Sequence, residues 1–290
     1  ACDDDTDLRS VPWRQANETV ALNQILTGNH ARANSIIRAW GNLVTDPREC
    51  KSLAFCVSVA HAKFMAEQFN AAGIIARTVT SETPPQERTE IPKQLERGDI
   101  HIIVTVDIYN EGVDLPFVDT LLLLRPTQSA TIFQQQIGRG LRLHEDKESC
   151  LILDFIGQHS ANFRFDVLYS SITGLSKREV LDGVENGFGR LPSGCHIQLQ
   201  KHAREHILAN LQNMLNQNWR RLQQELHTYS SIQGSHRIDL NDFLHDQQLD
   251  LEDVYRSGAG DKSGWTNLKR DAGLIQQPPC PEEAYFSRRF

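Results

Sequence analysis

Two arginines stand three residues apart after a short helix-like segment near the middle of the chain. The sequence there reads Gln135-Gln136-Ile137-Gly138-Arg139-Gly140-Leu141-Arg142. Residues three or four apart lie on one helix face, and glycine lets a ligand approach the backbone, so two guanidinium groups could grip one anion. A phosphoryl group in transfer is such an anion. Taken alone, the pair could equally be a surface feature of a helix C-terminus, where cations are favoured.

A second polar segment lies upstream of the arginines. An apolar run at residues 100–106 leads into residues 105–116, which contain a hydroxyl group, several carboxylates and Gly112. Ligands of open parallel sheets bind beyond the carboxyl ends of the strands, so we expect this segment to border a ligand. The competing interpretation is an ordinary acidic connection.

These segments belong to an alternating pattern of apolar runs and helical stretches. The helical stretches are residues 60–72, 85–96 and 129–137. Continuous apolar strands separated by helices are typical of a parallel sheet buried on both faces, so we predict a doubly wound α/β domain. The five expected strands are residues 52–57, 74–79, 100–106, 120–124 and 150–155.

The rest of the chain predicts helical appendages. Residues 1–48 begin with an acidic stretch expected to be irregular, followed by two helical patterns, and are interpreted as an interdomain linker. Residues 49–160 form the expected α/β domain. Residues 161–275 predict an α-helical accessory region, with one long helix at 203–229 and shorter ones at 240–245, 249–255 and 265–272. Residues 276–290 are interpreted as a tail.

Composition narrows the class of protein. Apolar residues make up 39% of the chain and charged residues 23%, as in ordinary globular proteins. A net charge of −7 argues against a freestanding nucleic-acid binder. No apolar stretch is long enough for a membrane span, so we expect no membrane partner. The scattered cysteines form no metal-ligand spacing; we therefore expect no metal site and a reduced, cytoplasmic protein, with Cys56 and Cys150 buried.

The motifs together resemble those of a known protein class. Residues 105–116 resemble helicase motif V, and Gln135 to Arg142 match the Gln-x-x-Gly-Arg-x-x-Arg form of motif VI in superfamily 2. Phe55-Cys56-Val57-Ser58 is similar to motif IV, and Gln86-Glu87-Arg88 to the weaker motif beside it. The chain thus resembles the second, RecA-like motor domain of superfamily 2 helicases. More narrowly, it resembles the C-terminal part of bacterial restriction-type DEAD/DEAH DNA helicases.

The resemblance implies a role for each matching residue. Arg139 and Arg142 would act as arginine fingers on the γ-phosphate of ATP, and Gln135 would sense nucleotide at the same cleft. Nucleotide-binding residues would be Gly112, Asp114 and Gly138. Contacts to nucleic acid would come from Ser58, Thr105 and Arg88. DNA is the implied nucleic acid, and RNA is left open.

Half of an ATPase site is missing from the sequence. No Gly-Lys-Ser/Thr loop follows a strand: residues 257–263 contain Gly, Lys and Ser, but Asp261 interrupts them. Asp154 ends an apolar run, yet Phe155 stands where a catalytic Glu would be, so Asp154 is interpreted as a structural acid at a strand end. We therefore expect ATP and Mg²⁺ to be bound mainly by an N-terminal RecA-like domain of the same protein, and this chain alone to be inactive as an ATPase.

Two other function classes compete with this interpretation. The fold could serve as a non-catalytic scaffold for protein partners, although a scaffold has no need of Gln135, Arg139 and Arg142. A Rossmann-type cofactor enzyme would need Gly-x-Gly-x-x-Gly after the first strand, and residues 59–62 contain no glycine.

Overall fold

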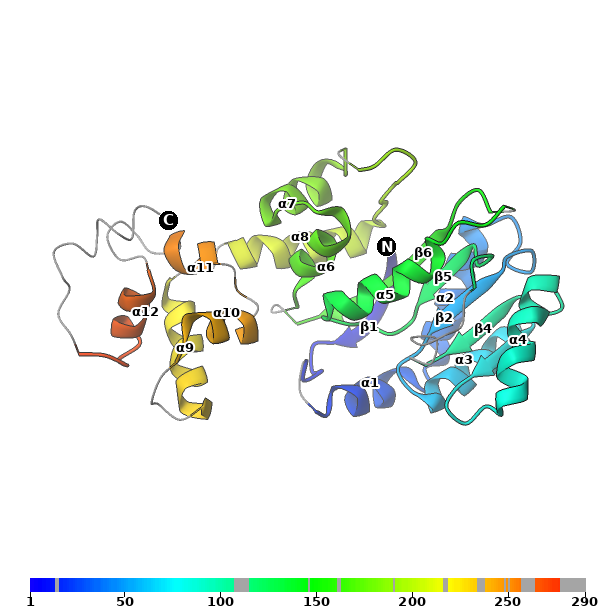
Figure 1. Cartoon of the computed structure of the whole chain (residues 1–290), viewed down its shortest axis with the longest axis horizontal. Helices are drawn as coiled ribbons and strands as arrows, with labels where there is room; N and C mark the ends of the chain where they lie inside the picture. The colour runs from blue at the N-terminus through cyan, green and yellow to red at the C-terminus, as the bar shows by residue number, and fades with distance from the viewer. Residues whose placement is uncertain are drawn as a thin grey trace. The chain divides into compact units, whose positions relative to one another are not determined.

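A six-stranded sheet, with every strand pair parallel, forms the centre of the first part of the chain (Figure 1). The computed structural model describes residues 1–13, 16–106, 115–145, 147–160, 163–189, 191–215, 219–233, 238–247, 249, 251–256 and 264–276. The chain divides into two units, Ala1–Gln212 and Asn213–Phe290. In sheet order the strands are β1 (Cys2–Leu8), β6 (Leu151–His159), β5 (Thr120–Leu123), β2 (Ser52–Phe55), β4 (Ile102–Thr105) and β3 (Ala76–Val79).

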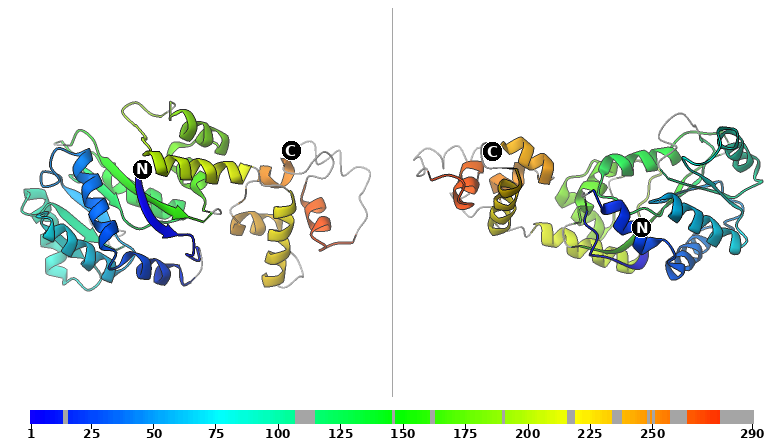
Figure 2. Two further views of the ribbon diagram at one scale, coloured as in Figure 1. Left: turned by 180° about the vertical axis from the view of Figure 1, so that it is seen from behind. Right: turned by 90° about the horizontal axis from the view of Figure 1, so that it is seen from below.

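Helices cover both faces of this sheet. Successive residues of β2 point to opposite faces: Leu53 and Phe55 pack into one core, Ala54 and Cys56 into the other. On the Ala54 face lie α2 (His30–Leu43) and α3 (Val59–Ala71), and on the Leu53 face lie α4 (Pro85–Arg97) and α5 (Ala130–Gly140) (Figures 1 and 2). The predicted doubly wound α/β fold is confirmed.

Further helices of the first unit pack beside these layers. α6 (Phe165–Thr173), α7 (Lys177–Asn186) and α8 (Lys201–Leu215) extend the core that contains α4 and α5, through buried side chains such as Leu168, Val184 and Ile207. α1 (Glu18–Leu26) buries Leu22 and Leu26 in a smaller cluster with Leu8.

The second unit is helical where it is described. Its helices are α9 (Trp219–Gln233), α10 (Leu240–Gln247), α11 (Leu251–Arg256) and α12 (Trp265–Asp271). They share a core that includes Leu226, Phe243, Val254 and Leu268. Residues 257–263, the interrupted Gly/Lys/Ser segment, lie outside the described residues. Within the described part of the chain, no helix has the length and apolar character to cross a membrane.

Three expectations about local structure were wrong. The acidic start of the chain is not irregular, because residues 2–8 form β1 and pair with β6. The last predicted strand does not end near Asp154 but continues to His159, because β1 supplies it with a partner. The single helix expected at 203–229 is described as two helices, α8 and α9; residues 216–218 lie outside the description.

A buried ion pair allows the acidic β1 to join the sheet. Asp4 accepts from Arg32 Nε on α2 at 2.7 Å, and both side chains are at most 5% exposed. Arg32 also donates to the Leu124 carbonyl at 3.4 Å, just beyond β5. Burial by itself would raise the pKa of Asp4, but Arg32 and the hydrogen bonds from Thr6 outweigh it and hold that pKa below its ordinary value. The pair therefore joins β1, α2 and the end of β5.

We expect Asp4→Ala to destabilise the chain by about 3–5 kcal/mol, because it leaves the buried Arg32 guanidinium without its counter-charge. Urea unfolding of the purified chain measures the change. The matched control is Asp7→Ala on the same strand, since the Asp7–Arg9 pair is exposed at both ends and should give no measurable change. Equal stabilities of the two variants would contradict a structural role for the buried pair.

Candidate active site

Helix α5 carries the arginine motif. Ser129 begins it, its side chain accepting from the Ile132 amide at 3.3 Å. Phe133, Gln136, Ile137 and Gly140 are buried, at the spacing of one helix face. Gln135 and Gly138 are exposed and Arg139 is half-buried, so the predicted nucleotide-side residues of this helix lie away from its core-facing side.

The two glycines of the motif differ in what surrounds them. A Cβ on Gly140 would lie 2.3 Å from the Cys150 sulfur and 2.8 Å from Leu121 Cδ1, so no side chain fits between the helix and the sheet there. A Cβ on Gly138 would have nothing within 4 Å. Gly140 therefore serves packing, whereas the space beside Gly138 is open to a ligand.

The close packing of Gly140 against the sheet shows at which end of the strands the neighbouring arginines lie. Leu121 is the second residue of β5, and Cys150 directly precedes β6. The C-terminal end of α5 therefore lies at the amino ends of these strands. Arg142 follows two residues after the helix and, like Arg139, is half-buried. It stands between two exposed apolar side chains, Leu141 at 62% and Leu143 at 97% exposure.

The predicted nucleic-acid contacts lie at the opposite end of the strands. The sheet register aligns Phe55, Thr105 and Leu123, the last residues of β2, β4 and β5. Ser58 follows β2, and Arg88 binds the loop that follows β3. The structure thus places two groups of predicted site residues at opposite ends of the strands. The arginines lie at the amino ends, and Ser58, Thr105 and Arg88 lie at the carboxyl ends.

The side chains of Thr105, Ser58 and Arg88 make hydrogen bonds within the chain. Thr105 is buried and its hydroxyl donates to the Val79 carbonyl at 2.8 Å. Ser58 accepts from the His61 amide at 3.0 Å and donates to Asn23 of α1. Arg88 donates to the carbonyls of Ser81 and Thr83 at 2.8 and 2.9 Å. Their contact with nucleic acid stays a prediction.

Two predicted nucleotide-binding residues, Gly112 and Asp114, lie outside the described residues. The described neighbours of their segment are informative. Val106 follows the carboxyl end of β4, and Leu115 begins a turn, closed by the Val118 amide donating to its carbonyl at 3.2 Å, that precedes β5. Val106 thus lies at the carboxyl end of β4, and Leu115 lies in the turn that precedes the amino end of β5.

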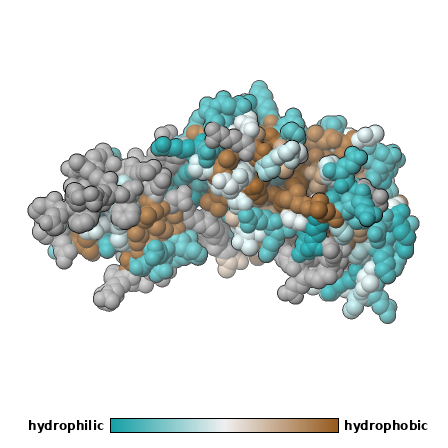
Figure 3. All heavy atoms as spheres, turned by 45° about the horizontal axis from the view of Figure 1, so that its top comes forward, coloured by the Kyte–Doolittle hydropathy of each residue, from teal (hydrophilic) through white to brown (hydrophobic). Residues whose placement is uncertain are grey.

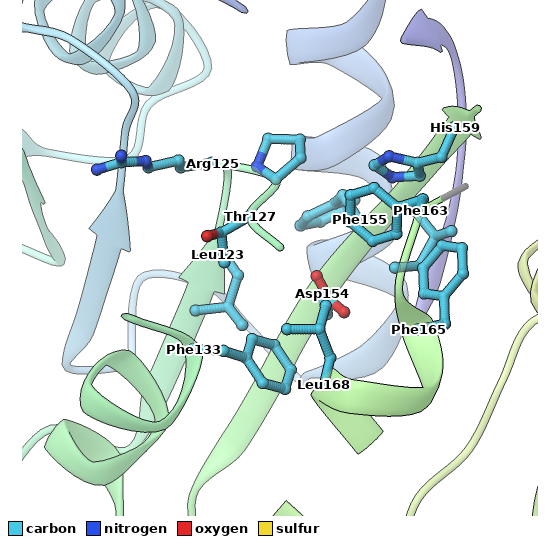
Figure 4. A pocket seen from close by; sticks show the side chains of 12 residues that line it. Leu123, Arg125, Thr127, Phe133, Asp154, Phe155, His159, Phe163, Phe165 and Leu168 are labelled. Atoms are coloured by element: carbon cyan, nitrogen blue, oxygen red, sulfur yellow. The ribbon is translucent and has the colours of Figure 1, made fainter. Parts of the chain in front are cut away.

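Sequence reasoning missed a polar and aromatic cluster at the end of β5 and along β6. Figure 4 shows Asp154 near Thr127 and His159 among Phe163 and Phe165, with Arg125 pointing away. Burial raises the pKa of Asp154 to about 6, and burial, aided by His206, lowers that of His159 to about 3. The cavity between these residues measures only about 10 Å³, too small for a substrate. Asp154 is thus an acid inside a strand, not at its end.

A larger cavity of about 370 Å³ shares Phe133 and Asp154 with the first and extends along the first residues of β6. Figure 3 shows apolar surface gathered on one face of this unit. Side chains around the cavity include Phe133, Ile137, Ile152 and Tyr169, with Asp154 as the acid, and no Lys or Arg is found among its described lining residues. Its polar lining also includes His196, Gln198 and Gln200, and none of the predicted site residues is among its described lining residues.

Comparisons with known proteins agree on the class of domain. Residues 35–144 match the model of the helicase conserved C-terminal domain, which therefore includes Arg139 and Arg142. The "Putative ATP-dependent helicase IRC3" of Saccharomyces cerevisiae is 41% identical over 109 residues, covering 38% of this chain and 16% of that protein. The "Putative mitochondrial ATP-dependent helicase irc3" of Schizosaccharomyces pombe is 39% identical over 120 residues, covering 41% and 20%.

More distant similarities extend the comparison. UvrABC system protein B of Treponema pallidum (strain Nichols) is 26% identical over 151 residues, covering 48% of this chain and 23% of that protein. Among solved structures, the Escherichia coli DEAD-box protein SrmB, bound to regulator of ribonuclease activity A, aligns with a TM-score of 0.39 and 19% identity over 48% of this chain and 78% of that one. Residues 35–144 are thus similar to the helicase conserved C-terminal domain, and the chain spans at most about a fifth of the two IRC3 relatives.

We expect alanine at the two glycines of α5 to have opposite effects on stability. Gly138→Ala should stabilise the chain by about 0.5–1 kcal/mol, because alanine favours the helix and nothing blocks its methyl group. Gly140→Ala should destabilise it by about 1–3 kcal/mol, because the methyl group collides with Cys150 and Leu121. Urea unfolding of both variants measures this. If Gly140→Ala proved as stable as Gly138→Ala, the close seating of α5 would be disproved.

Proposed function

We propose that this chain is the second motor domain of an ATP-dependent superfamily 2 DNA helicase or translocase. The main observation behind this proposal is the position of Arg139 and Arg142. They lie at the end of α5 that packs closely against the sheet, inside the segment that matches the helicase C-terminal domain. The arginines act as fingers on the γ-phosphate. Both residues are half-buried, and guanidinium groups held in place before the phosphate arrives would lower the barrier as preorganised charge.

Other residues of α5 fit the same target. Gln135 is exposed one helical turn before Arg139 and can approach the nucleotide from the same side. The open space beside Gly138 admits a phosphate or a facing loop close to the helix backbone. Gly112 and Asp114 would complete the nucleotide side from the segment that precedes Leu115.

The residues present fit only one half of an ATP site. When bound, ATP supplies the phosphoryl group and Mg²⁺ neutralises its charge; we propose that both are held mainly by an N-terminal RecA-like domain of the same protein. Leu141 and Leu143 beside Arg142 are exposed, and such a domain would cover them. The long relatives, of which this chain matches a minor part, are consistent with such a domain.

At the opposite end of the sheet we propose the nucleic-acid contacts, from Ser58, Thr105 and Arg88 or the backbone that they hold. Such contacts to phosphates fix position without reading sequence and do not require a basic overall charge. DNA is the proposed strand, with RNA as the alternative outcome of a binding assay. From the sequence resemblance alone we further propose the bacterial restriction-type group and a cytoplasmic location; the IRC3 match supports an ATP-dependent helicase only in the coarser sense.

We expect Arg139→Ala in the complete protein to lower the kcat for ATP at least 10³-fold, because it removes charge that acts only in the transition state. The Kd of a non-hydrolysable ATP analogue should change less than threefold. Arg97→Ala is the matched control: Arg97 also lies in the last turn of a helix, but pairs with Glu90 and Asp99 on the surface. Turnover unchanged by Arg139→Ala would favour the scaffold alternative.

The isolated chain should hydrolyse ATP at no more than background rate, with or without DNA, because it lacks the phosphate loop and the acidic pair. A phosphate-release assay on the purified chain, with the complete protein as the positive control, tests this. Robust DNA-stimulated hydrolysis by the chain alone, lost in Arg139→Ala, would show that it holds a whole ATPase site and would refute the division proposed here.

A further inference from the structure

Lys147 makes an unusual set of contacts behind the arginine motif. Its ammonium group donates to three backbone carbonyl oxygens: Pro116 at 2.7 Å, Gly140 at 2.9 Å and Val118 at 3.1 Å. A lysine has three N–H donors and no acceptor, so every donor of Lys147 is used within the chain. This cation is therefore engaged with backbone and is not set up to bind a phosphate.

The three carbonyls come from two segments that both border the proposed nucleotide. Gly140 ends α5 and lies between Arg139 and Arg142. Pro116 and Val118 belong to the turn that leads from the segment of Gly112 and Asp114 into β5. One side chain thus connects the end of the finger helix to the end of the other predicted nucleotide-binding segment.

Electrostatics favours this position for a cation. The last carbonyls of a helix lack partners within the helix and carry its negative dipole end, so a lysine there both satisfies Gly140 and gains from the dipole. The turn also contacts other side chains: the Phe117 ring lies 6.3 Å from that of His144, and Lys51 Nζ lies 5.8 Å from the Phe117 ring centre. Lys147 adds a polar connection to this packing that reaches both the helix end and the turn.

We propose that Lys147 is a positioning residue for phosphoryl transfer, which clamps the 115–118 turn to the end of α5 so that both nucleotide-facing segments keep one geometry. This inference rests on the proposed finger function of Arg139 and Arg142. Lys147 touches neither ATP nor the transferred group. It acts by holding Arg139 and Arg142 in register with the 115–118 turn, and a displacement of about 1 Å at such groups costs on the order of 100-fold in rate.

The test is Lys147→Met in the complete protein, which keeps the length of the side chain and removes its donors. We expect kcat for ATP hydrolysis to fall at least 10-fold, while the Kd of a non-hydrolysable ATP analogue stays within threefold of wild type. Lys147→Arg, which restores charged donors, should recover most of the loss. Lys93→Met, an exposed lysine on α4, is the matched control and should match wild type.

Several readouts separate positioning from mere stability. Each rate is divided by the concentration of folded protein, which is measured by titration with the ATP analogue. Partial unfolding therefore does not lower kcat. A folded Lys147→Met protein with wild-type kcat, or one whose loss lies wholly in analogue affinity, overturns the clamp. Should Lys147→Met fail to fold, Lys147→Gln replaces it: its shorter amide cannot reach three carbonyls, so a wild-type kcat would again overturn the proposal.

Failure of the clamp is distinguishable from failure of the proposed function. If Arg139→Ala is inactive and Lys147→Met is fully active, only the clamp is wrong. If Arg139→Ala retains turnover, the finger function is wrong, and the clamp falls with it because it has nothing to position. Loss of kcat in both variants, with analogue binding kept in both, supports the two proposals together.

Discussion

Helix α5 reaches the sheet as closely as it does because residue 140 has no side chain. The Cys150 sulfur and the Leu121 side chain occupy the space that a Cβ would need. This contact sets how close the end of the helix lies to the sheet, and Arg139 and Arg142 flank that end. Gly138, two residues earlier, meets nothing. The arginine motif therefore contains two glycines with different roles. Gly140 is required by packing, whereas Gly138 leaves open space beside the helix.

The sheet separates the two halves of the proposed chemistry. Its central strands are four residues long, so their ends are about 10 Å apart. Arginines face one end, whereas Ser58, Thr105 and Arg88 gather at the other. A motor that couples phosphate chemistry to movement on a strand needs the two sites joined by something stiff. Buried parallel strands and the Lys147 contacts provide that stiffness through packing and hydrogen bonds made within the domain.

The acidic start of the chain shows why some of the fold escaped prediction. Four aspartates in seven residues resemble a solvated linker, yet this segment forms β1. Its most buried charge, Asp4, is neutralised by Arg32, which lies 28 residues away on α2. Because an unpaired buried carboxylate is prohibitively costly, the strand is possible only with that partner. Nothing in the local pattern of residues 2–8 reveals it, and the extension of β6 past Asp154 depends on the same pairing.

The sequence by itself determined the central strands, the helices between them and the arginine motif, because apolar periodicity, helix caps and short motifs are local properties. It also indicated correctly that Cys56 is buried, whereas Cys150, expected to be buried as well, is half-buried. Only the tertiary structure decided which end of the sheet each site residue occupies, that the hydroxyl of Thr105 is used by Val79, and that Lys147 joins Pro116 and Val118 to Gly140. Those facts depend on strand register and on contacts between segments distant in the chain, which no local pattern encodes.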